Sequence, residues 1–190
     1  CITRLSVVSV NPANGKLRFR FPFNAPGPKV SAANPIVLDK DKLFVTASYQ
    51  AGAVFAQMQA DDVKILWQDD EVLSSQYTTP ILHKGLLIGI HGRQDIGNPV
   101  LRCIDPRTRK VLWEKEGLGY ATLLAADEKL LILTTEGELI LVALDTSAYR
   151  ELGRATLSNR TVRALPALAD GRLYVRDTDV LKCYDLRPAP

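Results

Sequence analysis

One loop of this sequence concentrates side chains that carry charge or form hydrogen bonds. Residues 91–99 read HGRQDIGNP and hold one of only two histidines. Imidazole, guanidinium, amide and carboxylate groups so close together suit the binding of a polar ligand or partner. No second histidine or cysteine lies nearby at metal-ligand spacing, and no Ser/His/Asp arrangement for nucleophilic catalysis is recognisable. We expect either a plain hairpin loop or a binding loop whose candidate residues are His91, Arg93, Gln94, Asp95 and Asn98.

This loop lies within a repeating unit of about 43 residues. Two independent sets of positions recur along the chain. The first set opens an apolar run after a polar turn and comprises Leu43, Leu87, Leu130 and Leu173. The second set ends an apolar strand at spacings of 40 residues and comprises Asp105, Asp145 and Asp185. Two sets of positions at nearly one period indicate a repeat architecture.

Each unit reads as four short strands separated by turns with Gly, Asp, Asn or Lys. In the best-formed unit, strands are expected at 79–83, 86–91, 100–105 and 111–115. No helical periodicity of useful length is present. Four strands in about 40–45 residues are typical of a propeller blade, so we predict an all-β fold, a β-propeller with four-stranded antiparallel blades.

The repeat predicts one propeller segment over residues 1–190. We expect partial blades at 1–23 and 163–185 and whole blades at about 31–68, 77–115 and 121–157, with a Pro/Gly-rich crossing from Pro22 to Pro28. Propellers commonly carry about 4–8 blades, and the family resemblance given below implies seven or eight, so these blades are expected to be the C-terminal half of a longer propeller. A closed four-bladed ring is the alternative. Open ends would favour a homodimer or pairing with missing N-terminal blades.

The propeller assignment gives two further sets of residues a place. Since the first strand of each blade lines the central channel, we expect Tyr77 and Thr78, just before such a strand, near the channel mouth. Phe19, Trp67 and Trp113 share one slot of the repeat. A periodic series of aromatic side chains is expected to fill the wedges between blades rather than to stack on a cofactor.

Composition excludes several functional classes. The net charge is +3, with 24 basic and 21 acidic residues interspersed, and no basic run of nucleic-acid type occurs. No apolar stretch is long enough for a transmembrane helix. The three cysteines, Cys1, Cys103 and Cys183, are not a disulfide framework. Cys103 and Cys183 share a slot on third strands, where we expect small buried side chains.

Two runs of residues resemble a known repeat. They comprise Asp105, Pro106, Thr108, Lys110 and Trp113, then Pro166, Gly171, Leu173, Tyr174 and Val175. These runs are similar to the pyrroloquinoline-quinone-like β-propeller repeat family, and the resemblance covers nearly the whole chain. The family includes the propeller lipoprotein of the outer-membrane β-barrel assembly machinery, a non-catalytic scaffold. It also includes quinoprotein oxidoreductases, which hold pyrroloquinoline quinone and calcium at the propeller centre.

The sequence favours the scaffold role over the enzyme. It has no adjacent cysteine pair of the kind that quinoproteins often carry, and no residue could be assigned as calcium ligand or catalytic base. We therefore predict no catalytic, cofactor-binding or metal-binding residue, and expect a protein or small ligand on the loop face or at the channel. Hydrolases and glycan-binding proteins also use propellers. The resemblance implies a bacterial protein that is periplasmic or otherwise exported.

Overall fold

A computed structural model describes residues 1–23 and 31–187, and every regular element in these residues is a strand. In chain order the strands are β1 (Ser6–Val10), β2 (Leu17–Pro22), β3 (Ile36–Leu38), β4 (Lys42–Ala47), β5 (Gly52–Met58), β6 (Val63–Asp69), β7 (Ile81–His83), β8 (Leu86–His91), β9 (Val100–Asp105), β10 (Lys110–Lys115), β11 (Ala121–Ala126), β12 (Lys129–Thr134), β13 (Glu138–Ala143), β14 (Glu151–Thr156), β15 (Ala167–Ala169), β16 (Arg172–Arg176) and β17 (Leu181–Asp185). The crossing predicted at Pro22–Pro28 lies, from residue 24 on, outside the described residues. No helix that could cross a membrane is found in residues 1–23 and 31–187.

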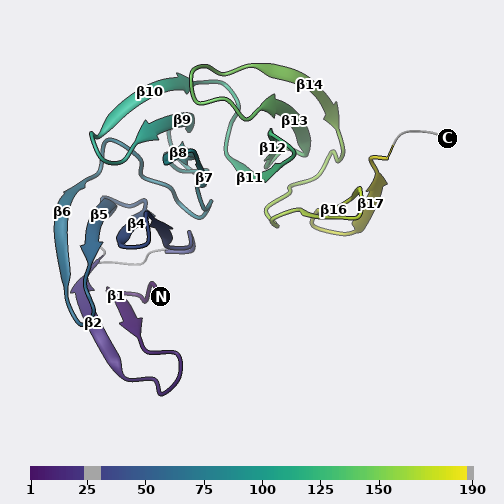
Figure 1. Cartoon of the computed structure of the whole chain (residues 1–190). Coiled ribbons are helices and arrows are strands. Elements are labelled where there is room, and N and C mark those ends of the chain that lie inside the picture. The colour runs from purple at the N-terminus through teal and green to yellow at the C-terminus, as the bar shows by residue number, and fades with distance from the viewer. Residues whose placement is uncertain (24–30, 188–190) are drawn as a thin grey trace.

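The strands form five antiparallel sheets, which we number as blades along the chain. Blade 1 is β1–β2, blade 2 is β3–β6, blade 3 is β7–β10, blade 4 is β11–β14 and blade 5 is β15–β17. Within each blade, neighbouring strands in the sequence are neighbours in the sheet. The blades follow one another along an open arc (Figure 1). The predicted all-β propeller with four-stranded antiparallel blades is confirmed.

The hydrophobic core is divided among the interfaces between blades. Four separate clusters of buried side chains form, one at each interface along the arc. Phe19 belongs to the cluster between blades 1 and 2, Trp67 packs against the next and Trp113 against the one between blades 3 and 4. Three of the four interfaces thus receive aromatic packing from the outer strand of the preceding blade, whereas β14, which precedes the fourth, has no aromatic residue.

The recurring aspartates share one local geometry at the turn after the third strand. Asp105, Asp145 and Asp185 each accept a hydrogen bond from the backbone N–H two residues on, at 2.9, 2.8 and 3.1 Å. Asn11 accepts the same bond from Ala13 at 2.9 Å. A short acceptor side chain that bonds its own backbone two residues ahead closes an Asx turn. The repeat therefore places the same turn at the same end of four blades.

The two tryptophans differ in the partner of the indole N–H. The Nε1 of Trp67 donates to the carbonyl of Pro106 in the next blade at 2.7 Å. The buried Nε1 of Trp113 has no acceptor among the described residues. The carbonyl of Thr146, 40 residues after Pro106, lies 3.9 Å from the Cys103 thiol instead. One blade interface therefore has a hydrogen bond that its neighbour lacks.

The prediction for the cysteines on third strands is right for one and wrong for the other. Cys103 on β9 is fully buried, because β8 and β10 flank it and blade 4 covers it. Cys183 is exposed. It lies on β17, the edge strand of blade 5, and within residues 1–23 and 31–187 no strand pairs with the outer side of β17.

Two glycines mark places where the chain leaves no room for a side chain. Gly52 and Gly137 follow the turns between second and third strands, at φ of 70° and 87°. A Cβ at Gly52 would lie 2.0 Å from the carbonyl oxygen of Asp69, and one at Gly137 would lie 2.2 Å from that of Ser158. In blades 2 and 4, the turn between the second and third strands thus packs directly against the segment that leads to the next blade.

Candidate functional site

The connections that carry the predicted binding residues lie at one end of the blades. Because the strands of a blade alternate in direction, the connection between its second and third strands lies at the same end as the link to the next blade. In blade 3 these are residues 92–99 and 116–120, and residues 70–80 lead in from blade 2. We call this end the loop face. The predicted loop and the predicted channel residues therefore lie on one face.

Gln76 connects the loop of blade 3 to blade 2. The backbone N–H of Gln94 donates to Oε1 of Gln76 at 2.8 Å. The Nε2 of Gln76 donates to the Tyr49 hydroxyl at 2.7 Å and to Asp95 at 3.3 Å. The amide side chain of Gln76 thereby contacts both the loop of blade 3 and Tyr49 of blade 2, and these contacts hold the loop in one conformation.

A second set of contacts joins blade 3 to the segment before blade 5. The Tyr77 hydroxyl donates to Oε1 of Gln94 at 3.0 Å, and Nε of Arg163 donates to the same oxygen at 3.1 Å. These three side chains line an open pocket of about 570 Å³ together with Gln76 and Asp95. We call it the Gln94 pocket. Its walls come from parts of the chain as far apart as Gln76 and Arg163, 87 residues from one another.

Tyr77 and Thr78 are held by the tyrosine that occupies the same slot one unit later. The Tyr120 hydroxyl accepts hydrogen bonds from the backbone N–H groups of Tyr77 and Thr78 at 2.9 and 3.2 Å. The two tyrosine rings have centroids 4.4 Å apart. Thr78 is buried and donates to the carbonyl of Ala121. Burial raises the pKa of Tyr77, so its hydroxyl stays a neutral donor.

Arg93 and Asp95 neutralise each other at the rim of this pocket. Both Nε and Nη2 of Arg93 donate to the Asp95 carboxylate, the first at 2.9 Å. The Arg93 guanidinium also lies 4.1 Å from the centre of the Tyr49 ring. The hydrogen bond from Arg93 lowers the pKa of Asp95. This pair is exposed and screened, so it positions the loop more than it stabilises the fold.

His91 has a structural contact rather than a free ring. Its Nδ1 accepts a hydrogen bond from the backbone N–H of Ser74 at 3.1 Å. Burial lowers the pKa of His91, and the nearby Arg102 lowers it further. A neutral imidazole is required for this acceptor role. His91 and Arg93 line a separate pocket of about 360 Å³ beside Ser48, Tyr49 and Asp70.

The structure thus divides the candidates of the predicted binding loop. Tyr77, Gln94 and Asp95 share the Gln94 pocket, and His91 and Arg93 line the neighbouring one. Thr78 is buried below the surface and Asn98 is exposed at the loop tip.

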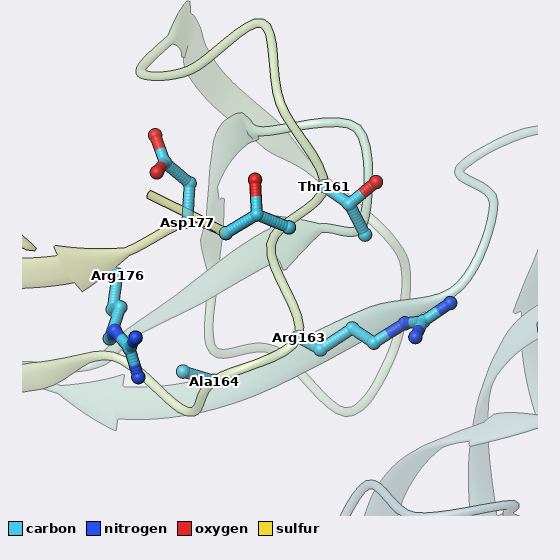
Figure 2. Close-up of a pocket in the computed structure, with 6 residues that line it drawn as sticks. Thr161, Arg163, Ala164, Arg176 and Asp177 are labelled. Carbon is cyan, nitrogen blue, oxygen red and sulfur yellow. The ribbon is translucent and has the colours of Figure 1, made fainter. Parts of the chain in front are cut away.

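A third pocket, of about 220 Å³, lies on the other side of Arg163 (Figure 2). It is lined by Arg163, Arg176 and Asp177, among others. The Asp177 side chain is 1% exposed, and its oxygens accept from the Ser158 hydroxyl and from the backbone N–H groups of residues 179 and 180. The hydrogen bond from Ser158 comes first among the causes that keep the pKa of Asp177 well below its usual range. Asp177 is therefore an ionised structural group.

Sequence reasoning missed Gln76, Tyr49, Arg163 and Arg176. A signal for Arg163 was present, since Tyr77, Tyr120 and Arg163 follow one another at 43 residues. They occupy one slot of the repeat, at the approach to three successive blades. No comparable signal marks the other three, because single polar residues in connections and at strand ends are common in any propeller.

The described residues do not fit a quinone with calcium. A calcium site needs about six to eight oxygen ligands, carboxylates prominent among them. No group of three or more His, Cys, Asp or Glu side chains that could hold a metal occurs in residues 1–23 and 31–187. On the loop face, Asp95 is engaged by Arg93 and Asp177 by Ser158. We therefore derive no chemistry through such a group.

Comparison with known proteins gives one family and several similar folds. Residues 97–185 match the family model described as outer membrane protein assembly factor BamB. The computationally designed Ika8 protein is similar at 14% identity and a TM-score of 0.61, over 98% of this chain and 57% of that chain. A comparison with curated proteins finds no match.

Two natural proteins have lower structural similarity. BamB from Moraxella catarrhalis is 13% identical, with a TM-score of 0.46, over 96% of this chain and 70% of that chain. A europium-containing methanol dehydrogenase is 13% identical, with a TM-score of 0.43, over 56% of this chain and 22% of that chain. At such identities the solved structures bear on the fold alone.

Proposed function

We propose, from the premise that this chain is a pyrroloquinoline-quinone-like β-propeller repeat protein, that it is a non-catalytic binding module. It holds a protein partner on the loop face, around the Gln94 pocket. One observation carries this proposal: Gln76, Gln94 and Arg163, from three separate segments, form an ordered polar pocket. Propellers commonly present such surfaces from loops on a rigid scaffold.

The match of residues 97–185 to the assembly-factor model supports a partner that is a protein, and an extracytoplasmic location forms part of the proposal. The loop that leads from β8 to β9 and the pocket on blade 5 lie within or beside the matched region. The runner-up role, a quinone-dependent oxidoreductase, has no supporting donor set among the described residues.

Site-specific photocrosslinking tests the proposal. A photoreactive amino acid replaces Asn98 at the loop tip or, as control, Asp61 in the connection between β5 and β6 at the opposite end of blade 2. Both positions are exposed. We expect a discrete crosslinked protein from position 98 and none from position 61, identified by mass spectrometry after irradiation of living cells that express the variant.

Equal crosslinking from both positions, or none from either, would contradict the proposed loop-face partner. Absorbance after incubation with pyrroloquinoline quinone and calcium provides a second test. Retention of the quinone at one molecule per chain would overturn the non-catalytic assignment.

A further inference from the structure

The orientation of the Gln94 amide is fixed by a donor that cannot accept. The Nε–H of Arg163 only donates, so the Gln94 atom 3.1 Å away is the oxygen. The Tyr77 hydroxyl donates to the same oxygen. The NH₂ group of Gln94 therefore points away from both. In the part of the chain that the structure describes, no acceptor is found for this NH₂ group.

Arg163 brings further donors to the same pocket. Its Nε is used by Gln94, and its two terminal nitrogens have no acceptor in residues 1–23 and 31–187. On the same face, Arg93 is paired with Asp95 and Arg160 with Asp179. Within the described residues no such carboxylate partner exists for Arg163. The Gln94 pocket thus contains amide and guanidinium donors and one unneutralised positive charge.

The one carboxylate in the Gln94 pocket does not cancel this charge. Asp95 already accepts from Arg93 through two nitrogens and from Gln76. The Arg93 guanidinium therefore neutralises the charge of Asp95 without any contribution from Arg163. The positive charge of Arg163 is therefore available to a ligand.

A second unpaired arginine extends the positive region. Arg176 lines the pocket on the far side of Arg163, and it too has no ion pair among the described residues. Figure 2 shows Arg163 extending away from Arg176 and Asp177, and its Nε donates to Gln94 of blade 3. The carboxylate of Asp177 is directed to Ser158 and to backbone N–H groups. The two pockets therefore form a donor-rich surface centred on Arg163.

We infer that the Gln94 pocket binds a carboxylate of the partner, with Arg163 and the Gln94 NH₂ group as donors. Guanidinium and carboxylate match in geometry and form short charge-assisted hydrogen bonds. This inference rests on the proposed function, since it names the group that the loop face recognises. The carboxylate belongs either to an acidic side chain within an extended segment or to the C-terminus of the partner.

Three peptides of equal length separate these sources. The first has internal Glu and Asp residues and an amidated C-terminus, the second is neutral with a free C-terminus, and the third is neutral and amidated. Each is titrated into ¹⁵N-labelled protein while nuclear magnetic resonance follows the side-chain NH₂ signals of Gln94 and the Nε–H of Arg163. We expect one carboxylate peptide to shift both sets of signals and the neutral amidated peptide to shift neither.

Two variants test the donors. Arg163→Gln removes the charge, and Gln94→Glu keeps an acceptor for Tyr77 and Arg163 while replacing the NH₂ donors by a negative charge. Each should weaken the binding of that peptide about tenfold or more, measured by backbone amide shifts. Arg18→Gln is the matched control, because Arg18 is an exposed arginine on β2 in another blade. It should leave the affinity unchanged.

The outcomes distinguish this inference from the proposed function. If neither carboxylate peptide binds better than the neutral one, or if both donor variants bind like the wild type, the inference is wrong. Crosslinking from position 98 whose yield is undiminished in Arg163→Gln would likewise refute the carboxylate contact while leaving the protein partner in place. The absence of any crosslink from position 98 in the protein without a donor substitution would instead refute the proposed function.

Discussion

The two tryptophans of blades 2 and 3 provide a matched experiment on a single hydrogen bond. Trp67 and Trp113 occupy one slot of the repeat, and both are partly buried. Only Trp67 has an acceptor for its indole N–H, the carbonyl of Pro106. Phenylalanine at either position removes the N–H and a similar part of the ring. The loss of apolar contacts should therefore be similar in Trp67→Phe and Trp113→Phe.

The polar contributions have opposite signs. Trp67→Phe loses a hydrogen bond and leaves the Pro106 carbonyl, in a buried residue, without its donor, which costs about 1–3 kcal/mol. Trp113→Phe removes a buried donor that has no acceptor among the described residues, and relief of that penalty offsets part of the lost packing. We expect Trp67→Phe to be more destabilising by about 1–3 kcal/mol. Arg109, whose guanidinium lies 5.8 Å from the centre of the Trp67 ring, can keep a weaker contact with phenylalanine.

Urea unfolding of the two variants and the wild type, followed by far-ultraviolet circular dichroism, measures this difference. Equal slopes with urea concentration are required for the comparison. Losses that agree within about 0.5 kcal/mol, the usual scatter of such measurements, would show that the Pro106 hydrogen bond contributes nothing. A larger loss in Trp113→Phe would refute the reasoning altogether.

Three other expectations follow from single residues. Since burial lowers the pKa of His91 in the folded state, its contribution to stability is present above about pH 6.5 and is lost as pH falls through the lowered pKa; His91→Asn should flatten the urea midpoint between about pH 7.5 and about pH 5. Gly52→Ala should destabilise by more than about 2 kcal/mol in thermal unfolding, because its Cβ would overlap a carbonyl oxygen, whereas Gly153→Ala on exposed β14 should be neutral or stabilising by about 0.5 kcal/mol. Burial raises the pKa of the Cys103 thiol to about 11, so iodoacetamide should label Cys1 and Cys183 first in native protein, and mass spectrometry of the adducts would reveal any early reaction of Cys103.

The fold was predictable because the signals that mark its turns are local. Asp105, Asp145 and Asp185 each close a turn with their own backbone two residues on, so the signal needs no distant contact. The apolar runs alternate with these turns at a nearly fixed period. The exposure of Cys183 was not predictable from its slot, because it depends on whether a further strand covers β17.

The candidate site was predictable only in part. The loop at 91–99 was visible as an unusual cluster of polar residues, and Tyr77 as a residue just before a first strand. The pocket, however, depends on the contact of Gln94 with Arg163, 69 residues away. Whether two residues so far apart in sequence meet in space depends on the curvature of the blade arc. His91 illustrates the opposite case, since its polar ring serves the backbone of Ser74 rather than a ligand.

The sequential strand order within each blade has a consequence for how this chain loses its structure. Every hydrogen-bonded ladder is confined to one blade, and each interior cluster joins only two adjacent blades. Such an array behaves as a chain of nearest-neighbour couplings, in which a sheet flanked on both sides opens last. Amide exchange should accordingly be slowest in β8 and β9 and faster in the two-stranded and three-stranded sheets. The opening of one blade would then affect the other blades only through the blades that lie between them along the arc.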